Sequence, residues 1–429
     1  MSMATRGRRL KIAFVNQPWN SAIPPVQAGS IAIWTYQIAR HLSKTCDVVV
    51  YGRAESKNRV KYDEGVQYRY VQTWPDTTLR RLFDTSSRWC PARRPLFASR
   101  LYYLRYSLQI AKDLRKKDCD VVHLHNFSQF VPIIYSRNPS IKTLLHMHCE
   151  WLTQLDRTIV EPRLAKTDIV TGCSKYITDS IREAFPQYAN RCRVTHNGVD
   201  IRTFSYLSNR ETRKKGPRRI LFVGRITPEK GLDVLLDAFE KVVAHYPGVD
   251  LHIIGPFALT SPEFISGLSD DEQISALAPL YSQNYLTHLR QRATSRLGNK
   301  VAFSGFVPHS QLVDHYRNAD ILVNPSFSES FGMSLIEAMA TGLPVVATRA
   351  GGMPEVVEHQ KTGILVAPGD ASALASALLY LLSNDSARSS MARAARKRVT
   401  NIFSWESVSA KLLGLYQGMC HTHLVGASS

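Results

Sequence analysis

The sequence predicts an α/β protein built from two doubly wound domains, each with a mostly parallel sheet. Its 429 residues exceed the roughly 150 residues of a typical single domain. Short apolar strands alternate with helical patterns along the chain, which is typical of parallel sheets covered on both faces. A polar, basic stretch from Leu207 (LSNRETRKKGPRR) separates two such series and is typical of a linker. We therefore predict domains over residues 1–206 and 207–403, followed by a C-terminal segment, 404–429.

The first series begins with a buried strand at Arg9–Val15, then a Pro- and Gly-containing loop, then a helix over Ile31–Leu42. The helix is expected because its apolar residues recur at helical spacing. Four further apolar runs are predicted as strands: Cys46–Tyr51, Val121–Leu124, Thr143–Met147 and Ile169–Thr171.

The second series contains six strand candidates: RILFVG, DLHIIG, KVAFSG, ADILVNPS, LPVVAT and TGILVAP. Residues 257–284 are longer than an ordinary connection and are predicted to form an inserted lid. The last apolar helix, about Trp405–Leu415, is expected to pack back on the first domain. Ligands of open α/β sheets bind beyond the carboxyl ends of the strands, so two such sheets facing each other would form an interdomain cleft.

Net charge is the unusual bulk property, since 54 Lys and Arg against 35 Asp and Glu give a formal charge of +19. The apolar fraction of 44% is ordinary, which excludes a mainly disordered chain. Through Tyr206 there are 32 basic and 16 acidic residues, and the remainder holds 22 and 19. The partners are therefore expected to be anionic, and the first half should meet them.

The segment Arg80–Lys117 holds eleven basic residues and two acidic ones. Five apolar residues in it fall at helical spacing: Phe97, Leu101, Leu104, Leu108 and Ala111. Two interpretations stay open. The helix packs on the core with a solvated basic face, or it is an amphipathic patch that docks on an anionic membrane or acceptor.

Seven cysteines are scattered without metal-type or redox-type spacing, which favours a reducing compartment. The apolar run near the start is too short for a signal peptide, and no window approaches the length of a spanning helix. We expect a cytoplasmic protein, or one that lies peripherally at the inner face of the membrane.

The strongest pattern lies in residues 324–357, NPSFSESFGMSLIEAMATGLPVVATRAGGMPEVV. A strand ends at Asn324, a polar loop follows, and a helix is predicted from Phe331 to Ala340. Its free N–H groups and dipole favour a phosphate. Glu329 and Glu337 would accept hydrogen bonds from hydroxyl groups on either side of that phosphate. A nucleotide sugar is such a ligand.

A second pattern, LFVGRITPEKG, places Arg225 and Lys230 in a loop after a strand. One guanidinium and one ammonium at a strand end form a plausible diphosphate clamp. A basic pair in such a loop is also common as solvated surface, so the assignment depends on the neighbouring carboxylate pattern.

Together with HNGVD and VAFSGFV, these patterns resemble the retaining nucleotide-sugar glycosyltransferases of family 4, which have the GT-B fold. The resemblance is specific over about Val194–Leu415 and looser before it. It implies that Arg225 and Lys230 bind the donor diphosphate, that Glu329 contacts the sugar hydroxyls and that Glu337 holds the ribose. It places these further residues at the donor: Phe306, Val307, Phe331, Gly332, Met333, Ser334 and Leu335.

In the first half, the resemblance assigns Ala28, Gly29 and Ser30 to the loop that closes over phosphates and acceptor. It assigns His148 to the histidine beside the donor sugar, and the catalytic set is then His148, Glu329, Arg225 and Lys230. For His148 a structural role at a strand end stays open, and nearby His146 competes for the assignment. His123 and His125 also fit the family pattern, or simply pack at the strand end.

The resemblance implies a retaining hexosyltransferase that moves a sugar from a nucleotide-sugar donor to a hydroxyl acceptor. The donor is expected to be UDP-linked by default, with GDP-mannose next, and the acceptor is an anionic or lipid-linked glycan or a small metabolite. No metal and no other cofactor is expected, because no Asp-x-Asp cluster occurs and the basic pair can neutralise the leaving diphosphate. The alternatives are an epimerase of the same fold, a related phosphorylase and a basic nucleic-acid-binding protein. The last lacks a zinc-finger or RNA-binding aromatic motif, so no nucleic acid is expected.

Overall fold

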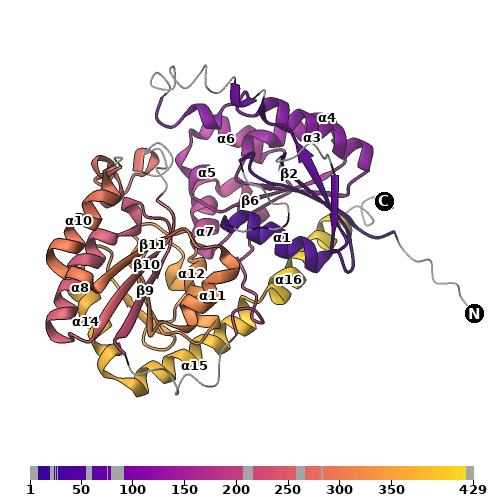
Figure 1. The fold of residues 1–429 in the computed structure, drawn as a ribbon. Coiled ribbons are helices and arrows are strands. Elements are labelled where there is room, and N and C mark those ends of the chain that lie inside the picture. Colours follow the sequence, from indigo (N-terminus) through magenta and orange to yellow (C-terminus); the bar gives the residue numbers. More distant parts are fainter. Residues whose placement is uncertain are drawn as a thin grey trace, which may run out of the picture. The chain divides into compact units, whose positions relative to one another are not determined.

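A computed structural model describes residues 8–19, 24, 26, 28–54, 60–74, 76–78, 91–205, 216–257, 266–281 and 284–421. The chain divides into two compact units (Figure 1). The first comprises Met1–Cys173, Ile177–Thr195 and Trp405–Ser429, and the second comprises Ser174–Tyr176 and His196–Ser404. The division between them therefore falls before His196, earlier than the boundary predicted after residue 206. Most of the predicted linker lies outside the described residues.

The first unit is built on an eight-stranded sheet in the order β3-β4-β2-β1-β5-β6-β7-β8. All neighbours are parallel except β3 and β4. The strands are β1 (Lys11–Val15), β2 (Asp47–Arg53), β3 (Val60–Asp63), β4 (Val66–Val71), β5 (Val121–His125), β6 (Lys142–Met147), β7 (Ile169–Gly172) and β8 (Cys192–Val194).

The central strands are buried on both faces, as their continuous apolar runs predict. Every residue of β5 is buried, including His123 and His125. The helices of this unit are α1 (Ser30–Leu42), α3 (Leu104–Lys117), α4 (Val131–Arg137), α5 (Trp151–Gln154), α6 (Arg157–Leu164), α7 (Lys175–Ala184) and α16 (Trp405–His421). Short 3₁₀ turns lie at Leu96–Ala98, Ser128–Phe130 and Pro186–Arg191. Helix α16 returns from the end of the chain and packs against α1.

The single amphipathic helix predicted across Phe97–Ala111 is wrong. Residues 79–90 lie outside the described part, and after the 3₁₀ turn α3 begins only at Leu104. Tyr103 has a φ of 55°, a left-handed conformation that an α-helix does not contain. Consequently Leu101 is 61% exposed. The face of α3 that is buried carries Tyr106, Ser107, Ile110, Ala111 and Leu114.

The second unit contains all six predicted strands in one parallel sheet, ordered β11-β10-β9-β12-β13-β14. They are β9 (Arg218–Val223), β10 (Val249–Ile254), β11 (Val301–Gly305), β12 (Ile321–Asn324), β13 (Val345–Thr348) and β14 (Gly363–Val366). The helices are α8 (Leu232–His245), α9 (Glu272–Ser275), α10 (Tyr285–Leu297), α11 (His309–Arg317), α12 (Met333–Ala340), α13 (Met353–Val356), α14 (Ala371–Ser383) and α15 (Asp385–Ile402). Short 3₁₀ turns lie at Pro228–Lys230, Ser266–Leu268, Ala278–Leu280 and Gly298–Lys300.

Each sheet reverses its strand order once, between β1 and β5 in the first unit and between β9 and β12 in the second. At such a switch point, the loops after the two central strands diverge and leave a crevice for ligands at the carboxyl edge. The loop after β9 carries Arg225 and Lys230, and the loop after β12 carries Glu329. The topology therefore brings the two strongest sequence patterns to one place.

The predicted lid over residues 257–284 is described in part, because 258–265 and 282–283 lie outside the described residues. In the part of the chain that the structure describes, no helix is both long and apolar enough to cross a membrane.

Candidate active site

The loop between β12 and α12 is the centre of the site in the second unit. Helix α12 begins at Met333, two residues later than predicted, because Gly332 takes a φ of 99° at the N-cap position. Phe331 is buried before it, and its ring lies 5.9 Å from that of His196 and 5.5 Å from that of Phe403. The first turn of α12 is therefore anchored by Phe331, with its N–H groups in position for an anion.

Two glycines allow neighbouring loops to approach this one closely. A Cβ atom at Gly231 would lie 2.2 Å from the carbonyl oxygen of Pro325, and one at Gly351 would lie 2.0 Å from that of Glu329. Both glycines also have positive φ values, 69° and 52°. The sequence patterns did not single out the Gly351-Gly352 pair. In the structure, Gly352 N–H donates to Glu329 O at 2.9 Å.

Lys230 and Glu329 form an ion pair, with 2.9 Å between Nζ and Oε2. Their side chains are 13% and 21% exposed, so the pair is well shielded from water. Burial alone would raise the pKa of Glu329, but the Lys230 ammonium, the Phe331 main-chain N–H and the Arg225 guanidinium together outweigh burial and hold this pKa below its ordinary value. Glu329 is therefore ionised at neutral pH and can only accept hydrogen bonds.

Arg225 is held from behind by Glu229, whose side chain is almost fully buried. Glu229 Oε1 lies 3.2 Å from Arg225 Nη2 and accepts from Thr227 Oγ1 at 2.7 Å. Its Oε2 accepts from the hydroxyl of Tyr281 at 2.8 Å. Tyr281 belongs to the segment predicted as a lid, which thus supports the basic loop.

Glu337 projects from the second turn of α12, where the sequence predicted a group for ribose hydroxyls. Its side chain is 5% exposed, and its two oxygens contact His309 Nε2 at 2.9 Å and the Tyr316 hydroxyl at 2.7 Å. Burial lowers the pKa of His309, but the Glu337 carboxylate more than compensates, so this pKa lies above its ordinary value. Neither partner of Glu337 was found from the sequence, because both lie on a different helix.

The remaining donor residues of the prediction lie in the same unit. Phe306 and Val307 follow β11, and Phe306 is 52% exposed although it is a large apolar side chain. In α12, Met333 and Ser334 are partly exposed, whereas Leu335 is buried and its N–H is bonded to Gly332 O. Met333 and Ser334 can therefore contact a ligand through their main chain.

In the first unit, Ala28, Gly29 and Ser30 are exposed at the start of α1, and Gly29 has a φ of 87°. His148 follows β6, two strands away from β1 in the sheet. Its main-chain N–H donates to Asn126 Oδ1 at 2.7 Å. Both sets of residues follow strands at the carboxyl edge of the sheet, the loop after β1 at the switch point and His148 one strand beyond β5.

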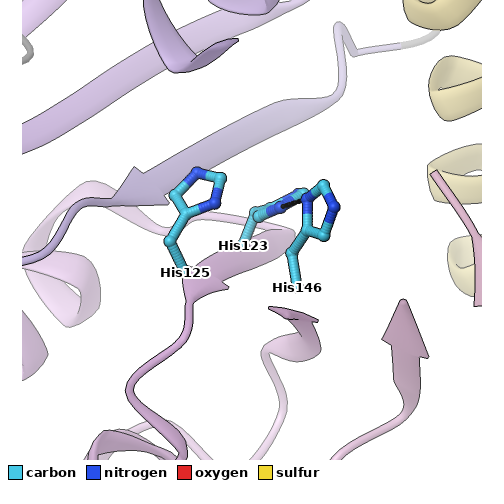
Figure 2. A group of neighbouring side chains, drawn as sticks. All are labelled: His123, His125 and His146. Carbon is cyan, nitrogen blue, oxygen red and sulfur yellow. Dashed lines mark hydrogen bonds between the residues drawn. The ribbon is translucent and has the colours of Figure 1, made fainter. Parts of the chain in front are cut away.

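His148 is one of four histidines on β5, β6 and the residue after it. Three of them, His123, His125 and His146, offer ring nitrogens that lie within 4.8 Å of one another, and all three are buried (Figure 2). His123 Nε2 and His146 Nδ1 are 3.1 Å apart, and His125 Nδ1 and His148 Nε2 are 3.0 Å apart. His123 and His125 are therefore both packed at the strand end, and each lies within hydrogen-bond distance of a second histidine.

Sequence comparisons identify families for both halves of the chain. The family model described as "Glycosyltransferase Family 4" matches residues 31–203, and the one described as "Glycosyl transferases group 1" matches residues 206–398. A glycogen synthase of Mycobacterium tuberculosis is 29% identical over 309 residues, which cover 69% of this chain and 68% of that protein.

Several solved structures share this fold. The sucrose-phosphate synthase of Thermosynechococcus elongatus superposes with a TM-score of 0.74 at 21% identity, over 96% of this chain and all of that one. Anabaena Alr3699/HepE in complex with UDP-glucose gives 0.65 at 19% identity, over 95% and 100%.

Two α/β units with these parallel sheets form the GT-B fold that the solved structures share, and the family models over both halves show that the chain is a glycosyltransferase. The matches over both halves make the assignment specific. The chain belongs to the family 4 type of glycosyltransferases.

Proposed function

We propose that the protein is a retaining, metal-independent transferase that moves a hexose from a nucleotide-diphosphate donor, most simply a UDP-sugar, to a hydroxyl acceptor. The observation that carries the proposal is the shielded Lys230–Glu329 pair at the switch point of the second unit. It sets a cation for a diphosphate beside an ionised carboxylate for sugar hydroxyls. Neighbouring Arg225, with its side chain 42% exposed, supplies the second cation.

The roles of the other residues follow from their chemistry. The start of α12 would receive the distal phosphate through its N–H groups. Glu337, already oriented by His309 and Tyr316, retains lone pairs for the ribose hydroxyls. Groups that bind phosphate, with a carboxylate for hydroxyls on either side of them, suit a ligand in which a diphosphate joins two polyols.

The main catalytic contribution in this proposal is electrostatic. As the bond between the anomeric carbon and the diphosphate breaks, negative charge develops on the leaving oxygen, and Arg225 and Lys230 stabilise it. In the front-face route, the departing phosphate accepts the proton of the attacking hydroxyl, so the new bond forms on the face from which the diphosphate leaves. The basic pair supplies this neutralisation from the chain itself, and the proposal therefore assigns no metal.

A UDP-sugar is favoured as donor by the Anabaena structure with UDP-glucose, and GDP-mannose is the second choice. The test is release of nucleotide from a panel of UDP-, GDP- and ADP-sugars, with and without EDTA, followed by NMR of the anomeric configuration of the product. We expect one base to be preferred, an unchanged rate in EDTA and a retained configuration. Strict dependence on a divalent ion would contradict the mechanism, and turnover of donor to an isomeric nucleotide sugar without acceptor would identify an epimerase.

For the acceptor side, we propose an anionic or lipid-linked acceptor met by the first unit, with the protein cytoplasmic or peripheral at the inner membrane face. Support comes from the exposed face of α3, which carries Arg105, Lys112, Arg115 and Lys116, and from exposed Leu101 just before it. Anionic vesicles should bind the protein in a salt-sensitive manner. Lack of binding and of any change in rate would leave this face as a solvated helix surface.

A further inference from the structure

The four histidines of the first unit are arranged as two hydrogen-bonded pairs. The register pairs His125 with His146 across β5 and β6, so His123, two residues before His125, shares their face. The indole of Trp34 covers all four rings, at centroid distances from 4.9 Å to 6.1 Å. Burial lowers the pKa of each of the four, that of His148 to about 3. Each ring is therefore neutral and carries a hydrogen on only one nitrogen.

Thr35 of α1 determines which nitrogen of His125 carries the hydrogen. The Thr35 hydroxyl oxygen lies 2.9 Å from Asn16 Oδ1, 2.9 Å from Ile31 O and 3.1 Å from His125 Nε2. Two of these three neighbours are carbonyl oxygens, which can only accept, so the single hydroxyl hydrogen is donated to one of them. The hydroxyl oxygen must then accept from His125, and His125 is the Nε2–H tautomer.

The tautomer of His125 fixes the tautomer of His148. With its hydrogen on Nε2, His125 has a lone pair on Nδ1, which lies 3.0 Å from His148 Nε2. His148 must therefore donate from Nε2, and its own lone pair is on Nδ1. That Nδ1 atom is buried and has no hydrogen-bond partner among the described residues. An unsatisfied acceptor of this kind calls for a donor group on a ligand.

We propose that Thr35 and His125 are positioning residues that hold His148 as the Nε2–H tautomer, so that Nδ1 accepts a hydrogen bond from a donor-sugar hydroxyl. The identity of that ligand rests on the proposed function, whereas the tautomer rests on the contacts within the first unit alone. His148 in this arrangement recognises a hydroxyl and transfers no proton. Thr35 fixes the tautomer of His125, and His125 in turn fixes the tautomer of His148.

The second pair shows why the cluster is assigned to hydrogen bonding rather than to a metal. The Tyr416 hydroxyl lies 2.6 Å from His123 Nδ1, and this phenol stays protonated because burial raises its pKa. If it donates to His123 Nδ1, His123 donates from Nε2 to His146 Nδ1 at 3.1 Å. The lone pairs of this pair are then engaged in hydrogen bonds. A divalent ion bound by His123, His125 and His146 would have to displace those hydrogen bonds. All three ligands are neutral, so the charge of the buried ion would stay uncompensated.

The test is the variant Thr35→Val in the full chain, with Thr35→Ser as the conservative rescue and Tyr416→Phe as the matched control in the other pair. Valine removes the acceptor that the described part of the chain offers to His125 Nε2–H. The His125 hydrogen should then move to Nδ1, donate to His148 Nε2, and leave His148 protonated on Nδ1. Long-range ¹H–¹⁵N spectra of histidine-labelled protein report which ring nitrogen carries the hydrogen. We expect the exchange at His148 in Thr35→Val only.

The kinetic readout is kcat/KM for the nucleotide sugar identified in the screen above. With its hydrogen on Nδ1, His148 can no longer accept a hydrogen bond from the sugar hydroxyl. The hydroxyl would have to rotate and accept instead, losing the orientation in which it donates, so we expect a loss of about tenfold in Thr35→Val. Thr35→Ser and Tyr416→Phe should stay near the wild type. Thermal unfolding of each variant separates this loss from a loss of folded protein.

Four results would overturn the proposal. They are a wild-type His148 protonated on Nδ1, an unchanged tautomer in Thr35→Val, a tautomer exchange without loss of kcat/KM, and one equivalent of a chelatable transition metal in purified protein by elemental analysis. If the wild type turns over no nucleotide sugar, the proposed function fails separately, and the spectra still decide the tautomer.

Discussion

Replacing Lys230 by alanine tests the diphosphate clamp most directly. In the proposed mechanism its ammonium stabilises the leaving diphosphate, a contribution similar to that of one oxyanion donor, about 2.7–4 kcal/mol or 10²–10³ in kcat. The substitution also leaves the Glu329 carboxylate without its partner at 2.9 Å. Glu329 is 21% exposed, so water can replace part of the lost interaction, and we expect a stability loss of about 1–2 kcal/mol.

The assay is nucleotide release at saturating donor, with thermal unfolding measured on the same preparations. A matched control is Lys241→Ala, because Lys241 Nζ also contacts a neighbour in this unit, Ser372 Oγ at 2.6 Å, but at the surface. The double variant Lys230→Ala, Glu329→Gln separates the two roles. If Lys230 served only to neutralise Glu329, the double variant would recover activity. A kcat of Lys230→Ala within about threefold of the wild type would refute the clamp.

Two further predictions concern the residues that support the donor site. The raised pKa of His309 means that its ion pair with Glu337 stabilises the fold fully below pH 6.5, and this stabilisation is lost as pH rises through the raised value. NMR titration should place the His309 midpoint above 6.5, and Glu337→Gln should lower it because burial then dominates; an unchanged midpoint would contradict the pairing. Tyr281→Phe removes a hydroxyl that donates to Glu229 and should lower kcat about fivefold. Tyr285→Phe, at the start of α10, removes a hydroxyl that donates to Asp233 instead and should not lower kcat; equal effects would refute a specific role of Tyr281.

The segment predicted as a lid acquires a more specific role from these contacts. Tyr281 contacts Glu229, and Glu229 contacts Arg225, so the segment orients a cation of the basic loop through one buried carboxylate. The long insertion therefore supports the basic loop through fixed contacts, and this role requires no movement of the insertion.

Much of the fold was predictable because parallel strands covered on both faces must be apolar along their length. The six strand candidates of the second half and the four of the first half after Arg9–Val15 are all strands of the structure. The helix predicted across Phe97–Ala111 was wrong because apolar spacing is the same whether or not the chain breaks at Tyr103, so the break was not predictable. Only the left-handed backbone there decides where α3 begins.

The sequence by itself determined that this is a glycosyltransferase and that Glu329, Glu337, Arg225 and Lys230 are its candidate donor residues. Arg225, Lys230 and Glu329 lie in short connections after strands and Glu337 lies in the helix that follows one of them, so local strand-to-helix patterns set their positions. Tertiary structure alone decided which groups orient them, since His309, Tyr316 and Tyr281 are brought close by other helices. The same holds for the chain from Thr35 through His125 to His148. A hydrogen-bond partner depends on strand register and helix packing to within about 1 Å, and no local sequence pattern carries that information.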